Sequence, residues 1–199
     1  MTLVELEGLL DLVQRLREET QTLELKAAAK GCPPYMDDTL SSFSNQDEGG
    51  IILFGVDEQQ DFAEPGVYDA QNLLKHIVEQ CNQMSPVIRP VFITLPKGNR
   101  IFAAAETPGV DGSDRPCFYA GKGCLKGSYV RAGDADRPIT EYEIYSYEAF
   151  RRKHQDDIHP VERASLQTLD AALTFVRAPV PKPSLTWRPV SGSTETITP

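Results

Sequence analysis

The sequence has no apolar run of about 18 residues or more, the length that a membrane-spanning helix needs. Its N-terminus also lacks the basic start, apolar block and small-residue cleavage site of a secretory signal peptide. Both absences predict a cytoplasmic protein with no membrane partner. The four cysteines include no C-x-x-C pair, and we expect them to stay reduced as small buried residues.

Two phosphate-binding signatures are also missing. The glycines form neither a G-x-G-x-x-G fingerprint nor a Walker loop, which excludes a conventional cradle for nucleotide phosphates. The three histidines are scattered along the chain, and no Ser or Cys triad is indicated. The chain does have 40% apolar residues over a length of 199, which is enough for an ordinary core and for one domain, alone or with an appendage.

Hydrophobic periodicity predicts a series of helices and strands. Helices are expected over 3–16, 36–43, 69–84 and 140–153, and capping boxes begin the first and the last of them. Strands are expected at 22–26, 51–56, 91–95, 101–105, 117–120 and 128–132. We expect the last four strands to form two hairpins, around turns at 96–99 and 121–123. The unbroken apolar run at 51–56 suits the centre of a sheet covered on both faces.

Residues 1–153 are expected to form the folded domain. Beyond them, 154–164 has the composition of a linker, and apolar spacing predicts one short helix within 166–176. Five prolines then fall between positions 179 and 199 among serines and threonines, a composition typical of an unfolded tail. The predicted organisation is therefore one domain over 1–153, followed by a linker, a short helix and a disordered tail over 154–199.

Charge is unevenly distributed along the chain. There are 20 basic and 29 acidic residues, which gives a net charge of -9, and no Lys or Arg lies between Gly31 and Leu74. The segment 115–131 is the reverse, with basic and aromatic residues and no acid. This mixture is typical of single-strand nucleic-acid binding, because cations neutralise phosphates and rings stack on bases. The alternative is a surface hairpin with core tyrosines. The candidate binding residues are Arg115, Lys122, Lys126, Tyr129 and Arg131.

A second group of candidate residues combines carboxylates with a lysine. Glu24 and Lys26 share one face of the strand at 22–26, and Glu19, or its neighbour Glu18, precedes that strand. Asp57 closes the strand at 51–56, so these side chains can converge if the two strands are neighbours. Two or three carboxylates can hold Mg²⁺ or Mn²⁺, and an adjacent lysine can orient water, as in metal-dependent nucleases. The alternative is an ordinary ion pair on an exposed strand face.

Several short segments follow one another in a definite order. They are E-T-Q-T-L-E-L-K at 19–26, F-S-N at 43–45 with E-G-G at 48–50, I-I-L-F-G-V-D-E at 51–58, P-C-F-Y-A-G at 116–121 and Y-V-R-A-G at 129–133. Together they resemble the Schlafen AlbA-like domain, over about residues 15–145. This family is also described as a DNA-binding or divergent AAA domain, and it is common at the N-terminus of bacterial and archaeal proteins classed as transcriptional regulators.

The resemblance implies a fold and a set of functional residues. The fold is an α/β (α+β) domain with a mixed, largely antiparallel sheet flanked by helices. In the animal Schlafen proteins the related module binds RNA, and some members cleave it with three carboxylates. Carried over to this chain, the catalytic and metal-binding carboxylates are Glu19, Glu24 and Asp57, with Lys26 beside them. The nucleic-acid face is then lined by Lys122, Lys126 and Arg131.

Three functions are compatible with these patterns. We favour a nucleic-acid-binding regulatory module, acting on RNA or DNA, in which the carboxylates are structural or vestigial. The second is an enzyme, an endoribonuclease that depends on Mg²⁺ or Mn²⁺. The third is a nucleotide (ATP)-binding or protein-interaction domain, which ranks last because the Walker loop is missing. Animal Schlafens pair two such modules, so a homodimer through the amphipathic N-terminal helix would supply the second module here.

Overall fold

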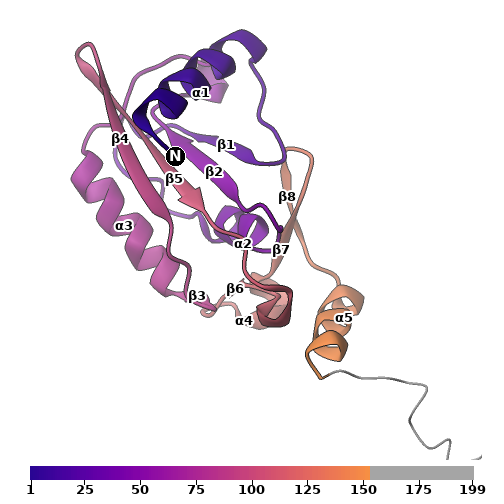
Figure 1. Cartoon of the computed structure of the whole chain (residues 1–199). Coiled ribbons are helices and arrows are strands. Elements are labelled where there is room, and N and C mark those ends of the chain that lie inside the picture. Colours follow the sequence, from indigo (N-terminus) through magenta and orange to yellow (C-terminus); the bar gives the residue numbers. More distant parts are fainter. Residues whose placement is uncertain (153–199) are drawn as a thin grey trace, which may run out of the picture. The chain divides into compact units, whose positions relative to one another are not determined.

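A four-stranded sheet with the strand order β1-β2-β5-β4 organises residues 1–152, the part of the chain that the computed structural model describes (Figure 1). Strand β1 (Leu23–Lys26) runs parallel to β2 (Gly50–Phe54). Strand β5 (Arg100–Thr107) pairs antiparallel with β2 on one side and with β4 (Val91–Lys97) on the other. The sheet is therefore mixed and largely antiparallel, as expected, and the predicted hairpin of β4 and β5 is confirmed.

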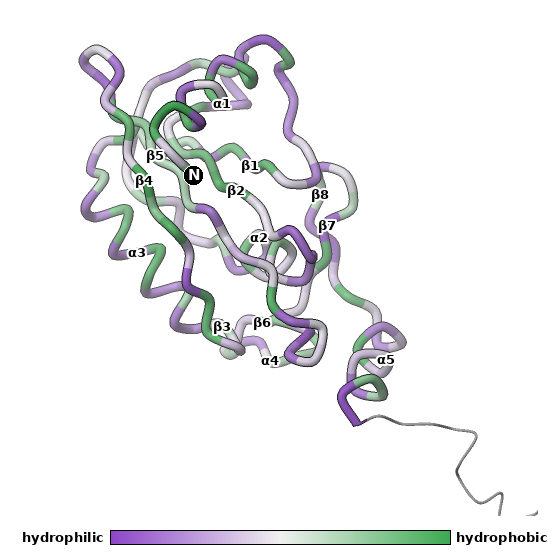
Figure 2. Tube along the Cα trace, in the orientation of Figure 1, coloured by the Kyte–Doolittle hydropathy of each residue, from purple (hydrophilic) through white to green (hydrophobic). Residues whose placement is uncertain are grey.

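Strand β2 occupies an inner position and is covered on both faces. Ile52, Leu53 and Phe54 are fully buried. Because successive side chains of a strand point to opposite faces, Ile52 and Phe54 enter one cluster of buried residues while Leu53 enters another. Figure 2 shows the apolar character of this strand along the tube. The prediction of a central strand buried on both faces is confirmed.

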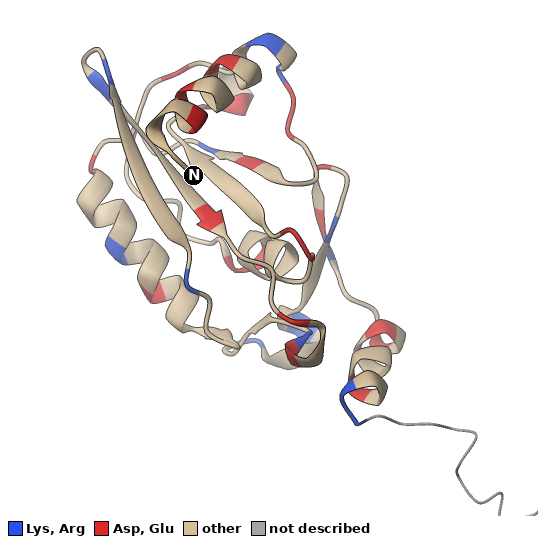
Figure 3. Ribbon diagram, viewed as in Figure 1, with Lys and Arg blue, Asp and Glu red and all other residues tan. Residues whose placement is uncertain are grey.

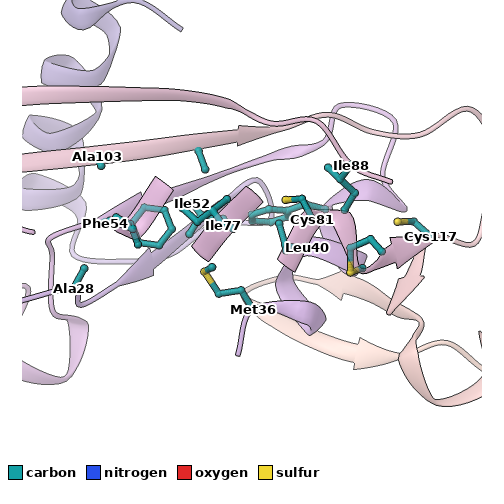
Figure 4. Close-up of a cluster of buried hydrophobic side chains, with 14 residues drawn as sticks. Ala28, Met36, Leu40, Ile52, Phe54, Ile77, Cys81, Ile88, Ala103 and Cys117 are labelled. Carbon is teal, nitrogen blue, oxygen red and sulfur yellow. The ribbon is translucent and has the colours of Figure 1, made fainter. Parts of the chain in front are cut away.

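Helices supply the apolar side chains that cover the two faces. Helix α1 (Leu3–Leu16) buries Leu6, Leu10 and Val13 in the same cluster as Leu53. Helices α2 (Asp37–Ser44) and α3 (Ala70–Asn82) contribute to the cluster on the other face, part of which is drawn in Figure 4. The members of that cluster from these two helices are Leu40, Phe43, Leu73, Ile77 and Cys81. The core therefore lies on both sides of the sheet.

The predicted helix starts are confirmed by their capping groups. Thr2 and Glu5 form a capping box at α1, and Thr140 and Glu143 form another at α5 (Glu141–Arg151). Asp69 accepts hydrogen bonds from two backbone N–H groups at the start of α3. These side chains satisfy N–H groups that would otherwise lack a partner in the first helical turn.

The second predicted hairpin, between 117–120 and 128–132, is reduced to a single antiparallel bridge between Phe118 and Ser128. Strand β6 (Phe118–Tyr119) instead pairs with β3 (Met84–Ser85), and β7 (Tyr129–Ala132) pairs with β8 (Ala135–Pro138). A short helix, α4 (Gly123–Gly127), occupies the segment predicted as the turn. The β7–β8 hairpin turns at Gly133. The φ of Gly133 is +69°, a value that suits a tight turn and that glycine adopts without steric cost.

The other features of the fold are two short helices, the state of the cysteines and the hydropathy of the helices. Short 3-10 helices lie at Glu58–Gln60 and Gly112–Asp114. All four cysteines are free, and Cys81 and Cys117 are buried. Over residues 1–152, no helix combines the length and apolar character needed to cross a membrane. The linker, short helix and tail that were predicted over 154–199 lie outside the described residues.

Candidate functional site

The side chain of Arg131 is the centre of a buried group of charges. It extends from β7, its side chain is only 1% exposed, and its guanidinium lies 5.3 Å from the centroid of the Phe43 ring. Its Nη1 lies 2.7 Å from Glu24 Oε2 and 3.0 Å from Asp136 Oδ1, and its Nη2 lies 3.6 Å from Glu19 Oε2. We refer to Arg131, Glu19, Glu24, Asp136 and Lys26 as the Arg131 cluster.

The Arg131 cluster joins elements that are distant in sequence. Glu24 and Lys26 belong to β1, the edge strand of the main sheet, whereas Arg131 and Asp136 are register partners in the β7–β8 hairpin. Arg131 Nη2 also donates to the backbone carbonyls of Thr20 and Leu23, each at 3.3 Å. The cluster therefore fastens the small hairpin to the edge of the main sheet.

Both carboxylate oxygens of Glu24 have cationic partners. Oε1 accepts a hydrogen bond from Lys26 Nζ, and Oε2 faces Arg131. The Asp136 carboxylate is equally engaged, since Oδ1 accepts from Ser42 Oγ at 2.5 Å and Oδ2 accepts from Thr39 Oγ1 at 2.8 Å. Both hydroxyls come from α2, so Asp136 also ties the hairpin to that helix.

Glu19 lies beside Arg131, and the pKa of its carboxyl is raised. Burial raises its pKa to about 7, and the charges of Glu24 and Glu58 act in the same direction. The hydrogen bond that Glu19 Oε1 accepts from the Leu25 N–H, at 2.7 Å, opposes the rise, as does the charge of Arg131. Near neutral pH the Glu19 carboxyl is therefore close to the midpoint of its titration, and the charge of the cluster changes there.

Asp57 is positioned differently from the other predicted site residues. It caps the 3-10 helix at Glu58–Gln60, where its carboxylate accepts from the Gln59 N–H at 3.1 Å and from Gln60 Nε2 at 2.7 Å. The parallel register places Glu24 beside Ile52, five residues before Asp57. The structure therefore brings Glu19, Glu24 and Lys26 together as expected, but it gives Asp57 no hydrogen bond or ion pair with any of them within residues 1–152.

These carboxylates do not fit a divalent-metal centre in the observed arrangement. Arg131 and Lys26 already neutralise Glu24, and a divalent cation placed there would be repelled by both. In the part of the chain that the structure describes, no three His, Cys, Asp or Glu side chains are grouped so that they could hold a metal ion. The observed chemistry of the Arg131 cluster is that of a structural ion-pair network.

The segment around α4 carries the other predicted binding residues. Lys122 is 44% exposed, pairs with Asp37, and lies over the rings of Tyr119 and Tyr129 at 5.7 and 5.9 Å from their centroids. Its pKa is raised by the hydrogen bond to Asp37, so Lys122 remains a cation at neutral pH. Lys126, four residues further on, is exposed at the end of α4.

Lys122 is the residue before α4 and Lys126 lies in its last turn, so both cations belong to one short segment. We call Tyr119, Lys122, Lys126 and Tyr129 the α4 face, and Figure 3 shows the basic residues on this part of the ribbon.

Two predicted binding residues are not available in the same way. Arg131 is enclosed by the carboxylates of its cluster, so the expectation that it lines a nucleic-acid face is corrected. Arg115 is 12% exposed, pairs with Asp47 Oδ1 at 2.7 Å, and donates from Nε to the Val110 carbonyl at 3.0 Å. Both arginine side chains are mostly buried and paired with carboxylates, whereas the lysine side chains of the α4 face are exposed to solvent.

Sequence reasoning missed Asp136 and Asn45. The position of Asp136 could have been predicted from a turn at Gly133, because a hairpin around that glycine sets Asp136 opposite Arg131. Asn45 is buried at the end of α2 and donates from Nδ2 to the carbonyls of Cys117 and Tyr129 at 3.0 and 2.9 Å. It also accepts from the Cys117 N–H at 2.7 Å. Asn45 lies in the F-S-N segment, which sequence reasoning used without assigning the residue a role.

Comparisons with known proteins place this geometry in context. Residues 19–140, which include the whole Arg131 cluster and the α4 face, match the family model described as Schlafen, AlbA_2. No curated protein matches the chain.

Two solved structures are similar to this chain to different degrees. The N-terminal domain of a RecG-related protein from Nitrosomonas europaea, named after ATP-dependent DNA helicases, is 22% identical with a TM-score of 0.52. That match covers 68% of this chain and 93% of the other. The DIP2311 protein from Corynebacterium diphtheriae is 16% identical with a TM-score of 0.46, over 66% of this chain and 28% of the other.

Proposed function

Because this chain belongs to the Schlafen AlbA_2 family, we propose that its domain is a nucleic-acid-binding module of a regulatory protein. The observation that carries the proposal is the family match over residues 19–140. The name of the Nitrosomonas europaea neighbour, which refers to DNA helicases, agrees with an association with nucleic acid. We place binding before cleavage because the carboxylates of the Arg131 cluster are occupied by cations and hydroxyls of the protein itself.

The α4 face is the binding surface in this proposal. The ion pair of Lys122 with Asp37 is partly buried, since the lysine side chain is 44% exposed and the aspartate side chain is 11% exposed. A phosphate can therefore approach Lys122 from the solvent side. Lys126 has no ion pair within residues 1–152 and is available directly. Tyr119 and Tyr129 lie beside Lys122 and offer rings to unpaired bases. The face therefore suits a single strand of RNA or DNA.

The acidic surplus of the chain sets the expected strength of binding. A net charge of -9 repels a polyanion at long range, and the favourable contacts come from few cations. We therefore expect a dissociation constant near that of non-specific complexes, about 10⁻⁴–10⁻⁶ M at physiological salt. A homodimer through α1 would double the number of contacts, and that arrangement stays a prediction.

The experiment compares two charge-matched double variants by fluorescence anisotropy with a labelled single strand. Lys122→Ala with Lys126→Ala removes the cations of the α4 face. Arg15→Ala with Arg100→Ala removes two exposed cations from α1 and β5 and serves as the control. The first variant should bind more weakly, and its slope of log affinity against log salt should fall by about 0.7 for each lost phosphate contact. The control should change little.

Two results would contradict the proposal. One is wild-type protein that binds neither RNA nor DNA at low salt. The other is an equal loss of affinity in both double variants, which would mean that only the net charge of the chain matters. All four substituted side chains are exposed, and a thermal melt checks that both variants remain folded at the temperature of the binding assay.

A further inference from the structure

A hollow of about 270 Å³ lies between the start of α2, the C-terminal half of α3 and the segment from β6 to α4. Figure 1 shows these elements meeting at one end of the domain. The walls of the hollow include Tyr35, Glu79, Gln80, Tyr119 and Lys122. Pockets for drug-sized ligands measure about 300–1,000 Å³, so this smaller hollow suits a fragment such as one nucleobase. It shares Tyr119 and Lys122 with the α4 face and is continuous with it.

Tyr35 provides an aromatic surface at the edge of the hollow. Its side chain is 78% exposed, which is unusual for a large ring that is anchored to the fold. The anchor is the next residue, Met36, which is fully buried and donates its N–H to Gln80 Oε1 at 2.9 Å. Tyr35 and Tyr119 therefore offer two rings, one exposed and one half-buried, on which an unpaired base can stack.

The charges around the hollow favour a base inside it and a phosphate outside it. Asp37 and Glu79 belong to the lining of the hollow, and within residues 1–152 His76 Nδ1, at 4.0 Å, is the one basic group that close to the Glu79 carboxylate. Carboxylates repel phosphate but accept hydrogen bonds from amino groups. The cations Lys122 and Lys126 belong to the adjoining α4 face, where a phosphate would be favoured. A strand crossing this region would thus direct its base inward and its phosphates toward the lysines.

We propose that the hollow is a subsite for one unstacked base that carries an exocyclic amino group. This inference rests on the proposed nucleic-acid function and adds a base preference to it. Cytosine presents an N4 amino donor where uracil presents the O4 acceptor. The carboxylate of Glu79 can accept from the first group and is repelled by the second, whereas Asp37 is already paired with Lys122. The hollow should therefore prefer cytosine to uracil, two bases of nearly equal size.

The test uses labelled oligo(C) and oligo(U) RNA of equal length, because their phosphate contacts are the same. Wild-type protein should bind oligo(C) at least about fivefold more tightly, the ratio that corresponds to one good base contact. Glu79→Gln should remove that preference, since an amide can also donate to uracil O4. Thermal melts should show both proteins folded alike, because the Glu79 side chain is exposed.

A second set of variants tests the stacking surface. Tyr35→Ala should weaken binding of both oligonucleotides about fivefold or more and leave the salt slope unchanged. Tyr35→Phe keeps the ring and should bind like wild type, which separates lost stacking from misfolding. Tyr68→Ala is the matched control, because Tyr68 is 81% exposed but lies outside the hollow, and it should have no effect.

The failure of this inference can be told apart from the failure of the proposed function. Equal affinity for oligo(C) and oligo(U), together with a Tyr35→Ala variant that binds normally, overturns the subsite and leaves binding on the α4 face intact. Wild-type protein that binds neither oligonucleotide at low salt overturns both.

Discussion

Glu19 shows how the fold changes the chemistry of a single residue. Its pKa is about 7 in the folded protein because of burial and nearby negative charge, against 4.5 for an ordinary glutamate. Between these two values the folded state holds a proton that the unfolded state has released. The free energy of unfolding therefore falls as the pH rises from about 4.5 to about 7.

Replacing Glu19 with Gln removes this titration and keeps an oxygen that can accept from the Leu25 N–H. The variant should gain about 1–3 kcal/mol of unfolding free energy at pH 8 and much less at pH 5. Urea titrations at the two pH values measure the difference. Glu18→Gln, at the exposed neighbouring position, is the control and should shift both values alike. A Glu19→Gln effect that is equal at both pH values would disprove the assigned cause.

At the scale of elements, the β7–β8 hairpin depends on one turn. Gly133 has a φ of +69°, and a side chain there is strained although the space around it is open. Gly8 lies within α1, also with open space around the position of a side chain.

The same substitution should therefore have opposite effects at these two glycines. Gly133→Ala should lower the free energy of unfolding by about 1 kcal/mol or more because of backbone strain. Gly8→Ala should raise it by about 0.5–1 kcal/mol, because alanine favours the helix. Urea denaturation of both variants measures the two values. Changes of the same sign would show that the turn at Gly133 does not control the hairpin.

At the scale of the whole molecule, the Arg131 cluster connects the main sheet, helix α2 and the β7–β8 hairpin. We propose that the carboxylates of Glu24 and Asp136 stabilise the domain and that the cluster does not catalyse cleavage. Glu24→Gln leaves Arg131 and Lys26 without their shared charged partner, and it should lower the free energy of unfolding by about 3 kcal/mol. Glu7→Gln, at an exposed position of α1, should change it by less than about 0.5 kcal/mol.

The same variant addresses the nuclease hypothesis. Structured RNA incubated with Mn²⁺ should remain intact with wild-type protein and with Glu24→Gln, as judged on a denaturing gel. Cleavage by the wild type that is lost in a folded Glu24→Gln protein would restore the three-carboxylate mechanism and refute the structural role.

Local patterns in the sequence were sufficient for most elements of the fold. The capping boxes at Thr2 and Thr140 set the starts of α1 and α5, and the apolar run at 51–56 identified the inner strand. Sequence reasoning placed the second hairpin around 121–123, because that segment also contains turn-forming glycines. The pairing of β6 with β3 depends on contacts with distant residues, such as those of Asn45, which no local pattern contains. The pairing of β7 with β8 follows the local turn at Gly133, a glycine that sequence reasoning did not use as a turn.

The sequence by itself determined the family, the longer helices and strands, and the closeness of Glu19, Glu24 and Lys26, because these features depend on neighbouring residues and on strand alternation. Only the tertiary structure decided that Arg131 points inward. A basic residue on a strand faces solvent or an acid according to which strand lies beside it, and here β1 and β8 bring three carboxylates to Arg131. Those long-range contacts occupy Arg131. Of the predicted binding cations, the lysines of the α4 face therefore remain exposed to a ligand.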